Sequence, residues 1–253
     1  MGKVNRPQIS IVVPFYNEEA CIESVCRECH EVFSETLDMP WEFIIVNDGS
    51  SDRTLELANR LHGEYREFRV LTLMPNSGQS AALTAGFKAA RGDLIATLDG
   101  DGQNDPGDLT ALLREMDRRK VHMMCGVRVR RADNWIRKIS SRIANRIRST
   151  VLNDNVSDVG CSLRVFRRTC LDRVVLFRNF HRFFPALFIM QGFTVSEMPV
   201  NHRPRREGES KYGGGIRSRL WVGLADLAGV FWLSRRSMCF EVTEQSGNGQ
   251  SIE

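Results

Sequence analysis

The sequence predicts an α/β fold in which a mostly parallel sheet is flanked by helices. Through the first 127 residues, short apolar runs rich in Val and Ile alternate with longer segments in which apolar residues recur at helical spacing. Strands and helices that alternate in this way form a parallel sheet, because each helix carries the chain back by a right-handed crossover.

The apolar runs and the turn residues between them set the expected elements of the first half. The expected strands are Ile9–Val13, Phe43–Val46, Val70–Leu73, Leu94–Leu98 and Val121–Val127. The expected helices run from Glu18 to about Glu35, from Thr54 to Leu61, from about Ser80 to Ala90, and from Pro106 to just before Val121. Proline suits the first turn of a helix, where its missing N–H would have no partner in any case.

The second half has weaker patterns. Its expected elements are a basic helix over Asp133–Val151, strands at Ser162–Phe166 and Phe193–Val200, and a mobile loop over residues 201–215, which are rich in Arg, Gly and Pro. The expected domain organisation is one domain over residues 1–215, a C-terminal amphipathic helix over 216–240, and a polar, disordered tail over 241–253.

The net charge of +4 hides a strong asymmetry along the chain. Residues 1–110 carry 9 Lys and Arg against 18 Asp and Glu, whereas residues 111–253 carry 26 against 13. An acidic half followed by a basic half suggests one site that needs carboxylates and a second site that receives an anion. The alternative is that solvated helix faces simply differ in sign.

The N-terminal residues and the cysteines indicate a cytoplasmic protein. The first ten residues lead directly into an apolar strand and lack the apolar core of a signal peptide. Seven cysteines, an odd number, fit reduced thiols better than a set of disulfides. Cys26 and Cys29 match a haem-attachment pattern that ends at His30, but in a helical segment two small apolar residues on a buried face are the simpler interpretation.

Three polar segments directly follow expected strands: Pro14–Glu18, Asn47–Ser50 and Asp99–Asp101. In open sheets of this class, ligands bind beyond the carboxyl ends of the strands. We therefore expect the three segments to meet along one edge of the sheet and to form the functional site there.

The pair Asp99 and Asp101, separated by Gly100, has the chemistry of a divalent-cation site. Mg²⁺ and Mn²⁺ prefer hard oxygen ligands and often take only one or two carboxylates, with phosphates and water completing the shell. Gln103 offers a further oxygen. A cation held there would neutralise the diphosphate of a nucleotide and act as a Lewis acid.

Four short motifs occur in order along the chain: VPFYNEE at 13–19, VNDGSSD at 46–52, NSG at 76–78 and LDGDGQ at 98–103. Together they resemble the family-2 inverting glycosyltransferases, in particular the dolichol-phosphate mannosyltransferase-like enzymes, which include bacterial polyprenyl-phosphate sugar transferases. The resemblance covers about residues 8–236 and implies the GT-A fold, a Rossmann-like α/β fold. It also implies a nucleoside-diphosphate sugar donor, such as GDP-mannose or a UDP-sugar, and a divalent cation, Mg²⁺ or Mn²⁺.

The resemblance assigns donor-side roles by position. It implies that Pro14, Tyr16, Glu18, Asp48 and Asp99 bind the nucleotide, with Asp48 at the base. It implies that Asp99, Asp101 and Gln103 hold the metal, and that Asp101 and Arg128 are catalytic. The residues alone leave simpler alternatives open: a strand stop for Pro14, a core aromatic for Tyr16, and a helix cap for Asp48.

On the acceptor side, the resemblance implies a polyprenyl phosphate such as dolichyl or undecaprenyl phosphate. Such a nucleophile is already anionic, so it needs positioning and charge neutralisation more than a general base. The implied phosphate-binding residues are Arg128, Arg142, Arg205, Ser210 and Lys211. Leu163 departs from the family, in which an aromatic residue is common at this position. For His181 we expect a buried, hydrogen-bonded histidine rather than a catalytic one.

The apolar stretch Leu220–Leu233 has 14 residues and one charge, Asp226. It is too short to span a bilayer, which takes about 20 apolar residues. Its two tryptophans and flanking arginines suit a helix at the membrane interface, and a helix that caps the sheet is an equal alternative. With a lipid acceptor, the protein would act peripherally on the cytoplasmic face of a membrane, or beside a separate membrane protein.

Two other functions remain to be weighed. A glycan or another hydroxyl compound could be the acceptor, for example in cell-envelope polysaccharide synthesis, but that reaction needs a carboxylate base. A nucleic-acid-binding role for the basic half is disfavoured, because the sequence has no recognisable nucleic-acid-binding motif with interleaved aromatic residues.

Overall fold

The computed structural model of the 253-residue chain describes residues 6–129, 146, 148–152, 154–204 and 216–238. Its seven strands are β1 (Ile9–Phe15), β2 (Trp41–Asn47), β3 (Phe68–Thr72), β4 (Leu94–Thr97), β5 (Met123–Arg128), β6 (Arg164–Arg167) and β7 (Val195–Val200). Its helices are α1 (Ile22–Thr36), α2 (Thr54–Glu64), α3 (Gln79–Ala89), α4 (Pro106–Arg119), α6 (Phe184–Met190) and α7 (Ile216–Ser234), with short 3-10 turns η1 (Arg168–Asp172) and η2 (Phe180–Arg182).

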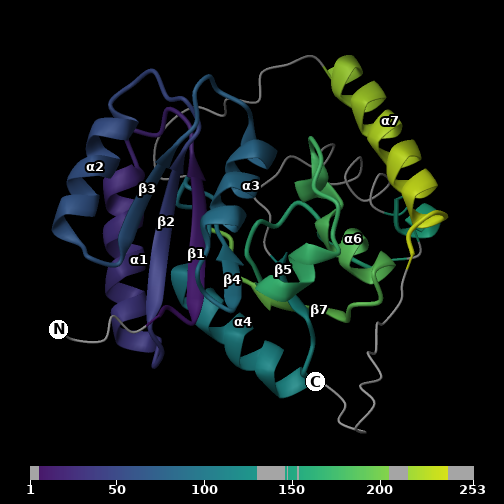
Figure 1. Ribbon diagram of the computed structural model, residues 1–253, viewed down its shortest axis with the longest axis horizontal. Coiled ribbons are helices and arrows are strands. Elements are labelled where there is room, and N and C mark those ends of the chain that lie inside the picture. Colours follow the sequence, from purple (N-terminus) through teal and green to yellow (C-terminus); the bar gives the residue numbers. More distant parts are fainter. Residues whose placement is uncertain (1–5, 130–145, 147, 153, 205–215, 239–253) are drawn as a thin grey trace, which may run out of the picture.

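The strands form one mostly parallel sheet in the order β3-β2-β1-β4-β6-β5-β7 (Figure 1). β1, β2, β3 and β4 run parallel, and β7 runs parallel to β5. Only β6, among the described strands, runs against its neighbours β4 and β5, between which it is inserted. The expected fold class is therefore confirmed.

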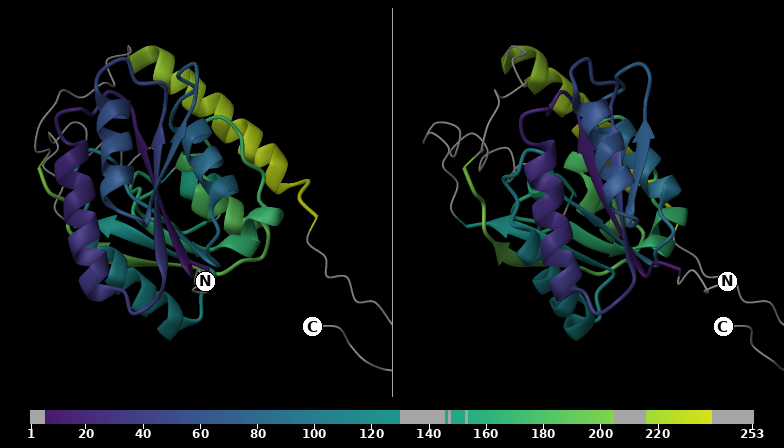
Figure 2. Two further views of the ribbon diagram at one scale, coloured as in Figure 1. Left: turned by 60° about the vertical axis from the view of Figure 1, so that its left-hand side comes forward. Right: turned by 90° about the vertical axis from the view of Figure 1, so that its left-hand side faces the viewer.

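Helices cover both faces of the sheet, so its central strands are apolar on both sides (Figures 1 and 2). On one face, α1, α2 and α4 pack on side chains such as Ile11 and Phe43. On the other face, α3 and α6 pack on side chains such as Val12 and Ile44, and α7 joins the same core through Val230. Because successive strand residues point to opposite faces, a continuous apolar run fills two cores at once.

Helix α1 begins later than the sequence predicts, at Ile22 instead of Glu18. The backbone amides that would open the helix are taken by the loop after β2: the amide of Glu18 donates to Thr54 Oγ1 at 2.8 Å, and that of Glu19 to Asp52 at 3.2 Å. Such side-chain acceptors compete with helical hydrogen bonds. Cys26 and Cys29 lie on the buried face of α1, as expected, and the six described cysteines are free and buried.

The less regular second half is described in part. β6 begins at Arg164 and β7 at Val195, each two residues after the expected start. Most of the expected helix Asp133–Val151 lies outside the described residues, although residues 148–152 are helical. The expected loop 201–215 is described only to residue 204, and the tail 241–253 lies outside the described residues.

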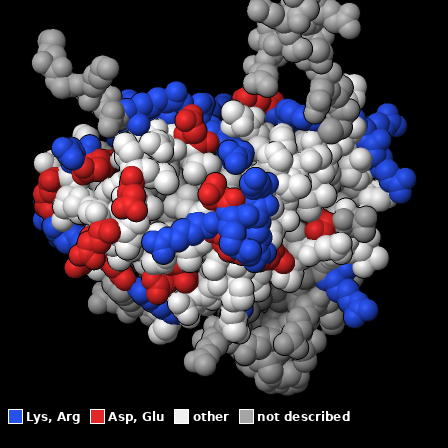
Figure 3. Space-filling model, turned by 90° about the horizontal axis from the view of Figure 1, so that it is seen from below, with Lys and Arg blue, Asp and Glu red and all other residues white. Residues whose placement is uncertain are grey.

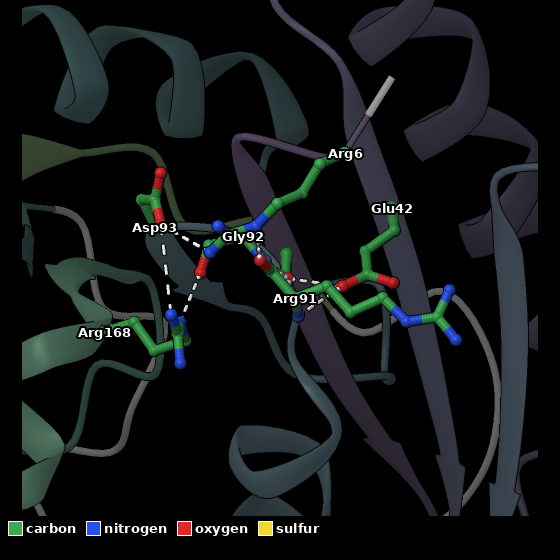
Figure 4. Close-up of polar contacts among 7 residues, drawn as sticks. Arg6, Glu42, Arg91, Gly92, Asp93 and Arg168 are labelled. Carbon is green, nitrogen blue, oxygen red and sulfur yellow. Dashed lines mark hydrogen bonds and ion pairs between the residues drawn. The ribbon is translucent and has the colours of Figure 1, made fainter. Parts of the chain in front are cut away.

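A buried polar cluster closes the amino-terminal end of the sheet (Figure 4). The Glu42 side chain, 4% exposed, accepts a hydrogen bond from the Arg91 amide at 2.7 Å and another from the Ser10 hydroxyl at 2.6 Å. Ser10 in turn accepts from the Gly92 amide at 2.9 Å. A Cβ on Gly92 would lie 2.7 Å from the backbone of β1, so only glycine fits. The cluster fixes the turn between α3 and β4, the two elements that lead into the site at the opposite end.

Candidate active site

A cavity of about 730 Å³ lies at the carboxyl ends of β1, β2 and β4, where the three polar segments were expected to meet. The cavity is lined by all eight described residues that the sequence predicts for the site: Pro14, Tyr16, Glu18, Asp48, Asp99, Asp101, Gln103 and Arg128. The four remaining predicted residues, Arg142, Arg205, Ser210 and Lys211, lie outside the described residues.

The two aspartates follow β4 at its carboxyl end. Asp99 accepts a hydrogen bond from the Gln79 side chain at 3.1 Å, and Asp101 accepts one from the Gln103 amide at 3.1 Å. Burial, reinforced by the neighbouring Asp101, raises the pKa of Asp99 to about 6. Two half-buried carboxylates that repel each other in this way favour the arrival of a cation between them.

Gly100 holds the two aspartates against the end of β1. A Cβ at this position would lie 2.6 Å from ring carbons of Phe15 and 2.8 Å from the carbonyl oxygen of Pro14. Only glycine allows this approach of the two backbones. The close packing of β1 against the Asp99–Asp101 turn therefore brings the nucleotide-side residues and the aspartates to the same corner.

The donor set suits a metal that is shared with a ligand. Within the described residues, no group of three or more His, Cys, Asp and Glu side chains gathers to hold a metal by itself. Mg²⁺ and Mn²⁺ seldom need such a cage, since phosphate oxygens and water complete their shells. Asp99 and Asp101 fit that pattern. The side-chain nitrogen of Gln103 donates to the Arg203 carbonyl at 3.3 Å. The side-chain oxygen of Gln103 is then the atom that would face a metal.

Two of the simpler alternatives for the nucleotide side are wrong. Pro14 does not stop its strand, because β1 continues through Phe15. Tyr16 is not a core aromatic, since 39% of its surface is exposed at the cavity.

Asp48 does not cap α2, because its carboxylate turns the other way, toward the loop before α3. It is 3% exposed and accepts hydrogen bonds from the amides of Ser77 and Gly78, each at 2.8 Å. The Asn76 side chain adds a third at 2.9 Å. Asp48 therefore shapes the cavity wall by holding the NSG motif in place.

The opposite wall of the cavity is basic. Among the described residues, four arginines line the cavity: Arg128, Arg164, Arg178 and Arg182. Arg128 makes a two-pronged ion pair with Asp158, at 2.8 Å for both contacts. Arg164 is 5% exposed and donates to the carbonyl oxygens of Val159 and His181, at 2.7 and 3.0 Å. A buried guanidinium held by neutral carbonyls keeps its positive charge directed at the cavity.

His181 is hydrogen-bonded, as expected, but it also lines the cavity. Burial, helped by the charges of Arg164 and Arg182, lowers the pKa of His181 to about 3, so its imidazole is neutral at pH 7. The sequence motifs assign no individual site role to Arg164, Arg178 or Arg182. The signal that was available is the excess of arginine in the second half of the chain.

The two halves of the chain thus meet across one cavity. The acidic lining residues, Glu18, Asp48, Asp99 and Asp101, come from the first half, and the lining arginines come from the second. On the outer face seen from below in Figure 3, basic and acidic side chains are instead interspersed.

The family follows from comparison with known proteins. Residues 10–175 match glycosyl transferase family 2. The chain belongs to this family. It is 38% identical over 234 residues to dodecaprenyl-phosphate galacturonate synthase of Rhizobium johnstonii, covering 90% of this chain and 68% of that protein. It is 34% identical over 206 residues to undecaprenyl-phosphate 4-deoxy-4-formamido-L-arabinose transferase of Salmonella choleraesuis, covering 81% of this chain and 62% of that protein. The chain thus spans about two thirds of the length of these relatives.

Solved structures confirm the GT-A fold of this glycosyltransferase. A mannosyltransferase from Pyrobaculum calidifontis, solved with GDP-mannose and Mn²⁺, superposes with a TM-score of 0.62 at 17% identity, covering 94% of this chain and 67% of that one. Glucosyl-3-phosphoglycerate synthase from Mycobacterium tuberculosis gives a TM-score of 0.61 at 19% identity, covering 88% of this chain and 80% of that one. At such identities the likeness concerns the fold alone.

Proposed function

We propose that this chain is an inverting hexosyltransferase that moves a sugar from a nucleoside-diphosphate sugar to a polyprenyl phosphate, with Mg²⁺ or Mn²⁺ at Asp99 and Asp101. The observation that carries the proposal is the division of one cavity into a carboxylate wall and an arginine wall. The names of the two polyprenyl-phosphate sugar transferases among its relatives support the acceptor class.

The donor would lie along the carboxylate wall. Tyr16, Glu18 and the loop held by Asp48 would receive the nucleoside, and the Asp99–Asp101 turn would face the diphosphate. A divalent cation bound there would neutralise the leaving diphosphate. The protein supplies the position: Gly100 is locked against β1, so the aspartates need not reorganise when the donor binds.

The acceptor would meet the arginine wall. An acceptor phosphate oxygen forms the new bond to the anomeric carbon as the bond to the donor diphosphate breaks on the opposite face, and the electron pair leaves with the nucleotide. Arg128 would neutralise the acceptor phosphate, and Asp158 holds the Arg128 guanidinium in position.

A specific observation disfavours the alternative of a hydroxyl acceptor. That reaction needs a carboxylate base beside the acceptor. Among the described residues on the second-half wall, none of those that line the cavity is Asp or Glu. The nearby Asp158 has both carboxylate oxygens engaged by Arg128.

We further propose that α7 rests on the cytoplasmic surface of a membrane. Val230, 2% exposed, packs into the second core, while Trp221 and Trp232 are 70% and 60% exposed and would be available to a membrane. No helix in the described part of the chain has the length and apolarity needed to cross a bilayer. The guanidinium of Arg236 lies 5.6 Å from the ring centre of Trp232, where it could meet anionic headgroups.

Transfer of a radiolabelled sugar to undecaprenyl phosphate tests the proposed function. A panel of UDP- and GDP-sugars would be supplied with Mg²⁺ or Mn²⁺, and product would be measured in the lipid phase. We expect transfer from at least one donor, lost on chelation of the metal. No transfer from any donor, or transfer only to a hydroxyl-bearing glycan, would contradict the proposal.

A further inference from the structure

The apolar stretch of α7 contains one charged residue, Asp226, and it faces the protein. Asp226 is half-buried, and its Oδ2 accepts a hydrogen bond from the side-chain amide of Asn179 at 3.0 Å. The exposed tryptophans of α7 lie elsewhere on the helix. A carboxylate on a mostly apolar helix is costly to bury unless it is hydrogen-bonded, so this contact fixes how α7 is turned against the domain.

Asn179 passes the contact on to the cavity wall. It stands just before η2 with a left-handed backbone, φ 71°. The backbone amide of Asn179 donates to the hydroxyl of Ser80 at 2.9 Å, and the same hydroxyl is hydrogen-bonded to Nδ1 of His181 at 2.8 Å. Asn179, Ser80 and His181 all line the cavity.

Ser80 lies in the first turn of α3, directly after Gln79. Gln79 donates to Asp99, one of the two proposed metal ligands. A continuous series of hydrogen bonds and one peptide link therefore runs from α7 through η2 and the start of α3 to the aspartate pair. Figure 2 shows α7 along the outside of the layer that contains α3 and α6.

We propose that Asp226 is a positioning residue for sugar transfer: by holding Asn179 it sets the cavity wall of Ser80 and His181 beside Asp99. The inference rests on the proposed function and adds to it that the seating of α7 controls the geometry of the catalytic pocket. Asp226 itself does not line the cavity and reaches it through Asn179. A membrane that binds the outer face of α7 would thereby influence the position of Ser80 and His181 in the cavity wall.

Asp226→Leu tests the link, because it keeps the helix apolar and removes the acceptor of Asn179. We expect kcat for sugar transfer to fall by about tenfold or more, since small displacements of positioning groups cost that much. Affinity for the nucleoside diphosphate measured without a metal should stay unchanged, because the link ends at Asp99, a proposed metal ligand, and not at Tyr16 or Asp48. Ala225→Leu, on the exposed side of the same helix, is the matched control and should behave as the parent protein.

An exchange of the two side chains gives the sharper result. Asn179→Asp alone sets two carboxylates against each other and should lower kcat at least as far as Asp226→Leu. The double variant Asn179→Asp with Asp226→Asn re-forms the hydrogen bond with its roles reversed, and aspartate tolerates the left-handed backbone at position 179. We expect it to recover most of the lost kcat. Full activity in either single variant, or no recovery in the double, would overturn the inference.

Hydrogen exchange separates this inference from the proposed function. In Asp226→Leu, the amides of residues 179–183 and 80–84 should exchange faster than in the parent protein, and the double variant should restore their protection. If the parent protein transfers no sugar, the proposed function fails while exchange still tests the link. If it transfers sugar but exchange in Asp226→Leu is unchanged, the link alone is wrong.

Discussion

At the scale of single residues, the site depends on groups held in place before any ligand binds. Gly100 lets the Asp99–Asp101 turn approach Phe15 so closely that neither aspartate can swing away freely. Asp48 uses its carboxylate to close the loop of Ser77 and Gly78. Preorganisation of this kind lets a site stabilise charge without a reorganisation cost at the moment of reaction.

Asp101→Asn keeps the shape of the side chain and removes its charge. We expect the metal-dependent part of UDP or GDP affinity to vanish, because one amide oxygen replaces a carboxylate in the cation shell. Titration calorimetry with and without Mn²⁺ measures this, with thermal unfolding as the check on the fold. Asp93→Asn, exposed at the far end of the sheet, is the control. Unchanged metal-dependent affinity in Asp101→Asn would overturn the site assignment.

His181 should make stability depend on pH. Its pKa in the folded state is about 3, whereas in an unfolded chain it is about 6.5. Between these values only the unfolded state binds the proton, so the free energy of unfolding falls as pH drops below about 6.5, by up to about 1.4 kcal/mol per pH unit.

Urea unfolding of the parent protein and His181→Gln across this pH range measures the effect. The difference in the free energy of unfolding between the parent protein and His181→Gln should be constant above about pH 6.5. At lower pH this difference should narrow, or reverse so that the variant is the more stable. His30→Gln controls for the loss of an imidazole elsewhere. A constant difference across the range would show that His181 does not titrate in this way.

At the scale of elements, hydrophobic pattern and residue propensity predict a helix or strand well when its bounds depend on its own residues and not on distant contacts. The first four strands and the helices between them were predicted to within a few residues because each buries a continuous or periodic apolar run. The start of α1 was missed because its first amides bond to Asp52 and Thr54, some 33 residues or more away in sequence. The reversed direction of β6 has no signature in its four residues, since it depends on which strands it meets.

The exposed tryptophans of α7 offer a test of the membrane proposal. The double variant Trp221→Ser with Trp232→Ser should bind anionic lipid vesicles at least about tenfold more weakly. Each indole withdraws on the order of 100 Å² of apolar surface from water, worth roughly 2.5 kcal/mol. Vesicle co-sedimentation measures the change, and Met74→Ser, which removes an exposed apolar side chain elsewhere, is the control. Equal binding of parent and double variant would contradict the proposal.

At the scale of the whole molecule, the charge asymmetry of the sequence becomes the asymmetry of the cavity. The acidic half folds into the side that carries Asp99 and Asp101, and the basic half supplies Arg128 and Arg164. Order along the chain made the first side predictable, because each motif directly follows a strand. The second side was only partly predictable. Arg178 and Arg182 reach the cavity from η2 and the residues just before it, and the position of this segment depends on contacts with Ser80 about a hundred residues earlier.

The polar cluster at the amino-terminal end of the sheet should matter for stability and not for binding. Glu42→Ala leaves the Ser10 hydroxyl and the Arg91 amide without their acceptor and the guanidinium of Arg69 without its ion-pair partner. We expect the free energy of unfolding to fall by about 3 kcal/mol. Urea unfolding measures it, while nucleotide affinity of the folded variant stays unchanged.

Glu42→Gln is the matched variant, because it retains an acceptor oxygen for Ser10 and loses only the charge. It should cost less stability than Glu42→Ala. Equal losses in the two variants would mean that the ion pair with Arg69, and not the hydrogen bonds, stabilises this end of the sheet.

The reversal of β6 means that the chain leaves β5 at Arg128 and re-enters the sheet at Arg164 on the same rim. The described residues 159–162, which lead back into β6, line the cavity directly. Under the proposed function, this stretch contributes to the recognition of the acceptor together with Arg164, Arg178 and Arg182, which lie at or beyond its end. Changes in the length or sequence of that stretch would leave β1, β2 and β4, which carry the nucleotide-side residues, undisturbed.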